Sequence, residues 1–145
     1  MPHDPTRTNS AHRKLDWVHR GLAAIGLSVD AYLHAHLAER YDAVSATISQ
    51  GTLFRIEAAL AALAALLVLV WRSALADVFA WAAAAGGLAA LLLYRYVDVG
   101  ELGPLPNMYE PTWFIDKNIA VAAQVVALIA TTLLLLTRRR RRHLA

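Results

Sequence analysis

One face of an expected helix near the N-terminus carries the residues most suited to chemistry: His19, Ala23, Gly26, Asp30 and His34. Their spacings of 4, 3, 4 and 4 residues are those of a single helix face. The surrounding stretch is mostly apolar, so an acid and a histidine one turn apart must face protein or water rather than lipid. Such a pair could bind a metal ion, a proton or a small solute, or it could form an ion pair.

Further charged residues are expected at the same depth, near the outer side of a membrane. Together they predict an outer polar cluster: Asp30, His34, Arg55, Glu57, Arg95, Asp98 and Lys117. An uncompensated charge in a membrane is costly, so we expect ion pairs in which Asp30 or Glu57 binds a cation. The candidate cations are Arg55, Arg95 and Lys117. We favour an ion-paired knot that fixes the helix register, with a functional site as the alternative.

A divalent metal site is the sharper chemical hypothesis for this cluster. His34, His36 and Asp30 could supply nitrogen and oxygen ligands for zinc, copper(II) or manganese. Nearby carboxylates could complete the set: Glu39, Asp42, Asp98, Glu101 and Glu110. However, helical residues two apart point about 200° apart, so both histidines can reach one ion only if the helix ends between them. The alternative is that they are polar groups at a helix end, and no cofactor is predicted.

Several classes of chemistry have no residues to support them. The chain has no cysteine, which excludes thiolate nucleophiles and disulfides within it. Phosphate-binding glycine loops, Gly-x-Ser-x-Gly and His-Glu-x-x-His are absent from the sequence. Haem would need axial ligands on facing helices, whereas every histidine lies in or beside the first apolar segment or in the terminal regions. An enzyme therefore ranks last among the function hypotheses.

Four apolar segments must position the polar cluster, and they lie at about 17–38, 53–72, 74–96 and 113–137. The last contains nineteen uncharged residues, 119–137, enough to cross a bilayer alone. Outer loops at 39–52 and 97–111 separate the segments. We therefore predict an all-α, integral membrane four-helix bundle over residues 15–137. A polar tail, 1–14, and a basic tail, 138–145, flank it.

The charge distribution predicts the orientation of these segments. Ten of the fourteen Lys and Arg residues, but only three of the eleven acids, lie in the stretches 1–20, 72–77 and 138–145. This positive-inside pattern places both termini in the cytoplasm and the protein in the plasma (inner) membrane. It also requires segment 17–38 to cross. The alternative for that segment is an amphipathic helix lying in the membrane surface.

An arginine run follows the last apolar segment: Arg138, Arg139, Arg140, Arg141 and Arg142. We interpret it as a stop-transfer anchor that also attracts anionic lipid. Because topology accounts for these charges, no nucleic-acid partner is predicted. On the same segment, Lys117, Gln124 and Thr131 recur every seven residues and should share one helix face.

Two segments carry a resemblance to known proteins: LHAHLAERYDA (33–43) and YRYVDVGELGPLPNMYEPTWF (94–114). With the Ala-, Leu- and Arg-rich spans, they resemble small uncharacterised four-span membrane proteins of high-GC Gram-positive bacteria, the actinobacteria. The architecture is also similar to that of DoxX-like proteins. The resemblance implies a four-span bundle and carries over no activity or site residue.

The sequence therefore predicts a small non-enzymatic membrane protein, an accessory or assembly subunit of a larger membrane complex. Loop 97–111, with three prolines and two glycines, is either its contact with that partner or a lid over the bundle. A homo-oligomer is the other expected assembly. The first alternative function is transport, or binding of a ligand or metal, at Asp30 and His34. The second is a small membrane enzyme.

Overall fold

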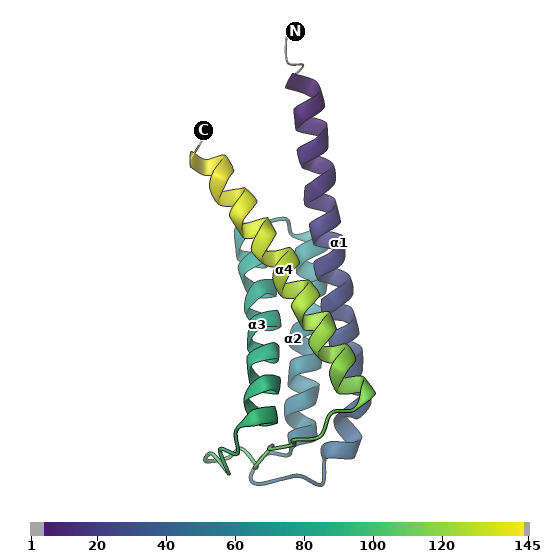
Figure 1. The fold of residues 1–145 in the computed structure, drawn as a ribbon, viewed down its shortest axis with the longest axis vertical. Coiled ribbons are helices and arrows are strands. Elements are labelled where there is room, and N and C mark those ends of the chain that lie inside the picture. Colours follow the sequence, from purple (N-terminus) through teal and green to yellow (C-terminus); the bar gives the residue numbers. More distant parts are fainter. Residues whose placement is uncertain (1–4, 144–145) are drawn as a thin grey trace.

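The computed structural model describes the backbone of residues 5–143 and the side chains of residues 13–140. Four α-helices account for most of this part of the chain: α1 (Pro5–Leu37), α2 (Gln50–Val70), α3 (Ala74–Tyr96) and α4 (Ile115–His143). A single 3₁₀ turn, η1 (Ala38–Tyr41), follows α1, and the described residues include no β-strand. The prediction of an all-α, four-helix fold is confirmed (Figure 1).

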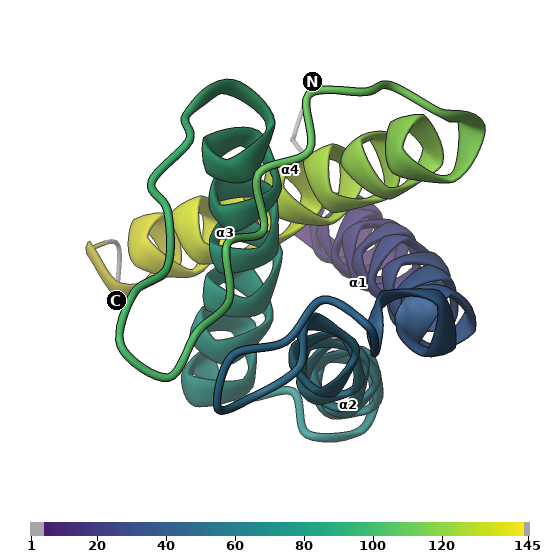
Figure 2. The ribbon, with the colours of Figure 1, turned by 90° about the horizontal axis from the view of Figure 1, so that it is seen from below.

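The helices form an antiparallel bundle in which α1 packs against α2 and α4, and α3 packs against the same two helices. Both ends of the described chain lie at one end of the bundle, with the short α2–α3 connection; we call this the terminal end (Figure 1). The longer connections lie at the opposite end, the loop end, seen from below in Figure 2. The outer loops of the sequence analysis correspond to this loop end.

Serine side chains fix the starts of the two central helices. Ser49 Oγ accepts a hydrogen bond from the Thr52 amide at 3.0 Å, and Ser73 Oγ accepts one from the Ala76 amide at 3.1 Å. Each bond satisfies one of the amides that a helix leaves free at its first turn. With only three residues between Val70 and Ala74, α2 and α3 must run side by side in opposite directions.

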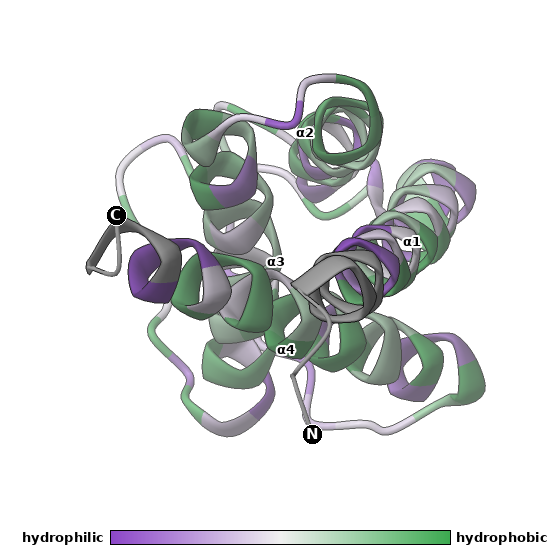
Figure 3. Ribbon diagram, turned by 90° about the horizontal axis from the view of Figure 1, so that it is seen from above, coloured by the Kyte–Doolittle hydropathy of each residue, from purple (hydrophilic) through white to green (hydrophobic). Residues whose placement is uncertain are grey.

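Small residues form most of the contact between the helices, while large apolar side chains point outwards. The innermost positions are alanines with no exposed surface: Ala23, Ala61, Ala64, Ala80, Ala84 and Ala127. Figure 3 shows hydrophobic residues along the outer faces of the bundle. Three stretches are long and apolar enough to cross a membrane: Gln50–Val70, Ala74–Tyr96 and Ile115–Arg140. A small-residue interior and an apolar exterior are typical of helices packed in lipid.

Helix α1 is less apolar than these three, but the two charged residues within its apolar segment lie on its buried face. Arg20 and Asp30 are each only 1% exposed. The opposite face presents Val18, Leu22 and Ile25, which are 54%, 44% and 63% exposed. The low mean hydropathy of α1 therefore reflects both the polar stretch 5–14 and buried residues that face the other helices.

A buried ion-pair network joins all four helices at the terminal end. We call it the Asp77 network; it comprises Asp16, Arg20, Arg72, Asp77 and Arg138. Arg20 donates to both Asp77 carboxylate oxygens, at 2.8 and 3.3 Å, to Asp16 at 3.0 Å and to the Val68 carbonyl at 2.8 Å. Arg138 reaches Asp77 at 2.8 Å, and Arg72 reaches Asp16 at 2.7 Å. Asp77 itself has no exposed surface.

This network changes the role of one arginine in the terminal run. Arg138 is bound to Asp77 and to the Arg72 carbonyl, so it holds α4 against the α2–α3 turn. Arg139 and Arg140 are exposed, consistent with a position at a lipid or water surface. The side chains of Arg141 and Arg142 lie outside the described residues.

The network should make stability sensitive to acid through Asp16. Burial alone would raise the pKa of Asp16, but hydrogen bonds from Arg72 and Arg20 outweigh it and hold this pKa below the ordinary 3.8. These bonds therefore stabilise the fold above the unfolded-state pKa, and the benefit disappears as the pH falls through the folded-state value. In thermal unfolding from pH 6 down to about pH 2.5, we expect Asp16→Asn to start lower than wild type and to decline less. Parallel curves would contradict this role.

Candidate functional site

A cavity of about 420 Å³ lies at the loop end, between the helices. All four helices line it, and residues of the 97–114 connection form its roof. Its walls are mostly apolar: Leu33, Leu37, Leu53, Phe54, Leu91, Met108 and Phe114. The charged or titratable side chains that reach it include His34, Glu57, Arg95, Glu110 and Lys117. This composition, apolar walls with a few polar groups, is typical of small-molecule sites.

The roof is fixed by bonds to the rest of the loop end. The Ile48 amide donates to the Pro104 carbonyl at 3.0 Å, which ties the α1–α2 connection to the α3–α4 connection. The Glu110 amide donates to the Tyr94 carbonyl at 3.0 Å, which holds the loop against the end of α3. Gly103 adopts a left-handed φ of 60°, a conformation that favours glycine, in the turn just before Pro104. The loop predicted as a lid or partner contact therefore covers the cavity.

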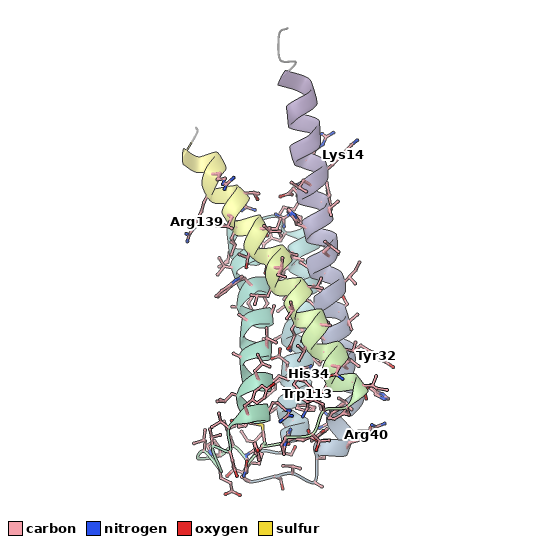
Figure 4. All side chains as sticks on the ribbon, in the orientation of Figure 1. Lys14, Tyr32, His34, Arg40, Trp113 and Arg139 are labelled. Atoms are coloured by element: carbon pink, nitrogen blue, oxygen red, sulfur yellow. The ribbon has the colours of Figure 1, made fainter. Side chains whose placement is uncertain are left out.

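Four side chains form what we call the carboxylate cluster: Asp30, His34, Glu57 and Gln124. His34 Nδ1 lies 3.1 Å from Asp30 Oδ1 and 3.0 Å from the Asp30 carbonyl oxygen. Gln124 Nε2 donates to the same Oδ1 at 2.8 Å. His34 and Glu57 line the cavity, while Asp30 and Gln124 are almost completely buried behind them. Figure 4 places His34 at the loop end, and Lys14 and Arg139 at the terminal end.

Three oxygen atoms of this cluster are buried and lack a hydrogen-bond partner among the described residues. They are Asp30 Oδ2, Glu57 Oε1 and Gln124 Oε1. Most buried polar atoms in proteins are paired, so three unpaired acceptors in one cluster require an explanation. These acceptors lie where the described protein places no donor within hydrogen-bond distance.

Gly87 on α3 provides the space for this cluster. A Cβ atom at this position would lie 2.6 Å from Gln124 Nε2 and 2.6 Å from Glu57 Oε1. The two side chains therefore come together against the bare backbone of α3. At the neighbouring Gly86, a Cβ would meet no atom within 4 Å. Of the two adjacent glycines, only Gly87 is required by the cluster.

Neither Asp30 nor Glu57 pairs with the predicted cations, and Asp30 contacts His34 instead. Lys117 instead lies 3.3 Å from Glu110 and donates to the carbonyls of Glu110 and Thr112. Arg55 pairs with Asp42 at 2.7 Å. The reason is that Glu57 lies too far inside the bundle, seven residues, or about 10 Å, from the start of α2. The cations near the helix ends reach the acids of the loops first.

Arg95 makes no ion pair within the described part of the chain. Its guanidinium carbon lies 5.0 Å from the centre of the Trp113 ring and 5.1 Å from that of Tyr96, which are cation–π contacts. Its Nε is buried without a hydrogen-bond partner. The arginine is therefore held at the cavity mouth by aromatic faces.

Two side chains outside the membrane-spanning helices, Tyr41 and Asp42, have shifted pKa values at the loop end. Hydrogen bonds from Arg55 lower the pKa of Asp42 below its ordinary value. Burial, together with the bond that its hydroxyl donates to Glu110 at 2.8 Å, raises the pKa of Tyr41. Asp42 is thus held as an anion and Tyr41 as a neutral donor, and both anchor η1.

The predicted metal ligands are not brought together. His36 stacks on Tyr32, with ring centroids 5.7 Å apart, while His34 packs edge-on against Phe54 at 5.1 Å. The two histidines therefore point in different directions, as helix geometry indicated. Across the described residues, no three His, Cys, Asp or Glu side chains form a group that could hold a metal ion.

Two further corrections concern which residues belong to the site. Asp98 bonds within its own loop, accepting from the Gly100 amide at 3.1 Å and from Asn107 at 2.9 Å, and does not line the cavity. Conversely, Gln124 was not among the residues predicted for the outer polar cluster, yet it bonds to Asp30. The seven-residue interval from Lys117 places Gln124 on the same face of α4. This interval could have indicated that Gln124 belongs to the cluster.

Comparison with known proteins adds no further constraint. No protein-family model, curated protein or solved structure matches the chain. The resemblance to actinobacterial and DoxX-like four-span proteins stays a prediction, and a function must be argued from the site.

Proposed function

We propose that this chain is a four-span membrane protein that binds a small ligand in the cavity at its outer end. In this proposal α1 crosses the membrane together with α2, α3 and α4, which makes four spans, and both termini are cytoplasmic. The outward apolar face of α1 supports its insertion, because lipid then meets uncharged side chains while Arg20 and Asp30 face protein. The exposed Arg139 and Arg140 support a cytoplasmic C-terminus in contact with anionic lipid.

One observation carries the ligand-binding function: the cavity under the loop is lined by Glu57, one of three neighbouring residues that have an unpaired buried acceptor. A bundle held together only by packing would not need a 420 Å³ cavity, nor would it leave three buried oxygens unsatisfied. Binding also agrees with the residues present better than catalysis, because the cluster contains no serine, threonine or cysteine for its histidine to activate. The accessory-subunit hypothesis stays a prediction, as does a partner or homo-oligomer.

Filling the cavity provides a direct test. Leu91→Trp adds bulk on the cavity wall, whereas Leu92→Trp places the same side chain at a neighbouring position, 36% exposed, that does not line the cavity. We expect wild type and Leu92→Trp to bind at least one of three water-soluble probes saturably: 2-phenylethylammonium, 2-phenylethanol or phenylacetate. Leu91→Trp should bind none of them. Isothermal titration calorimetry on protein in detergent micelles measures this.

Two results would contradict the proposed function. One is the absence of saturable binding of all three probes to wild type. The other is binding to Leu91→Trp as strong as to Leu92→Trp, which would locate the probe outside the cavity. Thermal unfolding of both variants controls for folding.

A further inference from the structure

We propose that the cavity is selective for an organic ammonium ion, with its N–H groups bonded to the carboxylate cluster and its apolar body against the cavity walls. This inference rests on the proposed ligand-binding function and specifies the chemical class of the ligand. It follows from three features of the site: the unpaired acceptors, the positions of the protein's own cations, and the nature of the walls.

The first feature is that every unpaired atom of the cluster is an acceptor. Asp30 Oδ2, Glu57 Oε1 and Gln124 Oε1 all lack a hydrogen-bond donor among the described residues. Gln124 Nε2 and His34 Nδ1 both contact Asp30 Oδ1. Of the two carboxylates, Glu57 lines the cavity, whereas Asp30 is buried behind it. A primary ammonium group at Glu57 would supply N–H donors and a positive charge to a carboxylate that has an unpaired oxygen. A single proton could satisfy only one of these oxygens.

The second feature is that the protein's own cations are committed elsewhere. Lys117 is bound by Glu110 and by two carbonyls, and Arg55 is bound by Asp42. Arg95 lies on the rings of Trp113 and Tyr96, at the last turn of α3 and well above the cluster. No lysine or arginine of the described residues forms an ion pair with Glu57. Apart from His34, whose Nδ1 contacts Asp30, a positive charge at this carboxylate would come from a ligand.

The third feature distinguishes an organic cation from an inorganic one. The described chain brings together no three-ligand metal group, so a metal ion would find too few ligands. The walls next to Glu57 are apolar and aromatic, with Phe54 packed 4.9 Å from the Tyr41 ring and 5.1 Å from the His34 ring. Such walls suit an apolar or aromatic body attached to the ammonium group. They cannot form hydrogen bonds with the water molecules around a small inorganic ion.

The charge of the probe should decide its affinity. 2-Phenylethylammonium, 2-phenylethanol and phenylacetate have bodies of similar size and differ mainly in the charge of the head group. By calorimetry on the full-length protein, we expect the ammonium ion to bind about tenfold or more tighter than the alcohol. Phenylacetate should bind weakest. Glu57→Gln should remove most of the preference for the ammonium ion and leave the affinity for the alcohol within about twofold.

The two adjacent glycines provide a matched pair of variants that leave every charge in place. In Gly87→Ala the new methyl group must displace the ends of the Glu57 and Gln124 side chains, so ammonium affinity should fall about tenfold. Gly86→Ala adds the same group in open space and should bind as wild type does. Because flexible side chains can move aside, both variants should fold, and thermal unfolding verifies this.

The outcomes separate this inference from the proposed function. Equal binding of the alcohol and the ammonium ion, with no effect of Glu57→Gln or Gly87→Ala, would overturn ammonium selectivity while leaving a ligand-binding cavity intact. The same holds if phenylacetate binds best, which would point to Arg95 as the recognition group. Failure of all three probes to bind wild type overturns both proposals.

Discussion

Replacing Asp77 by alanine should destabilise the fold by about 3–5 kcal/mol, the largest effect we expect from any single substitution in this chain. The carboxylate has no exposed surface and accepts hydrogen bonds from Arg20 and Arg138. Its removal leaves the guanidinium of Arg20 buried, with Asp16 and one carbonyl as its remaining partners. Removing one partner of a buried ion pair costs more than the intact pair contributes. Unfolding in mixed micelles, followed by circular dichroism, measures the loss.

Two further variants test the cause of this effect. Glu101→Ala removes an exposed carboxylate in the α3–α4 loop and should leave stability unchanged. The double variant Arg20→Met with Asp77→Leu removes both buried charges, so it should regain part of the stability lost in Asp77→Ala. If the double variant is less stable than Asp77→Ala, the loss comes from packing or other bonds rather than from the missing Asp77 partner of Arg20.

Gly26→Val should destabilise the protein by about 1–3 kcal/mol and separate α1 from α4. A Cβ at Gly26 would lie 2.6 Å from the Ala123 carbonyl oxygen and 3.1 Å from the Ala127 Cβ. The first of these atoms belongs to the backbone of α4, so the helices themselves must move apart. Asp30 lies one helical turn after Gly26, so that movement would disturb the hydrogen bond between Asp30 on α1 and Gln124 on α4. Unfolding experiments measure the stability, and 2-phenylethylammonium titration reports on the cluster.

Gly21→Val is the matched control, because it has the same change in helix propensity on the same helix. A Cβ at Gly21 meets no atom within 4 Å, so only the propensity difference should remain. Equal losses in the two variants would show that the close α1–α4 contact does not limit stability.

Much of the architecture could be predicted from the sequence because it depends on local properties. The long apolar stretches predicted helices, and three of the resulting helices are long and apolar enough to span a membrane. The spacing of Asp30 and His34 predicted that both lie on one face of α1, and the two side chains do meet. Helical periodicity makes such relations within one helix readable from residue numbers alone.

Relations between helices could not be predicted in the same way. Depth suggested that Glu57 would meet a cation, but the path of the loops brought Glu110 to Lys117 and Asp42 to Arg55 instead. Arg20 and Asp77 contributed to the topology prediction only as charges on one side of a membrane. Nothing in their positions, far apart in sequence, indicated that they form a buried pair. The rotation of each helix about its axis decides such pairings.

By itself, therefore, the sequence determined the helical class, the apolar stretches that can span a membrane and which residues share a helix face, since hydropathy and periodicity are properties of neighbouring residues. Only the tertiary structure decided that Gln124 joins Asp30, that Gly87 rather than Gly86 makes room for Glu57, and that three acceptors remain unpaired below a roofed cavity. These features depend on the packing of four separate helices and on the course of their loops. That packing is set by close contacts between residues far apart in the chain, such as Gly26 with Ala123.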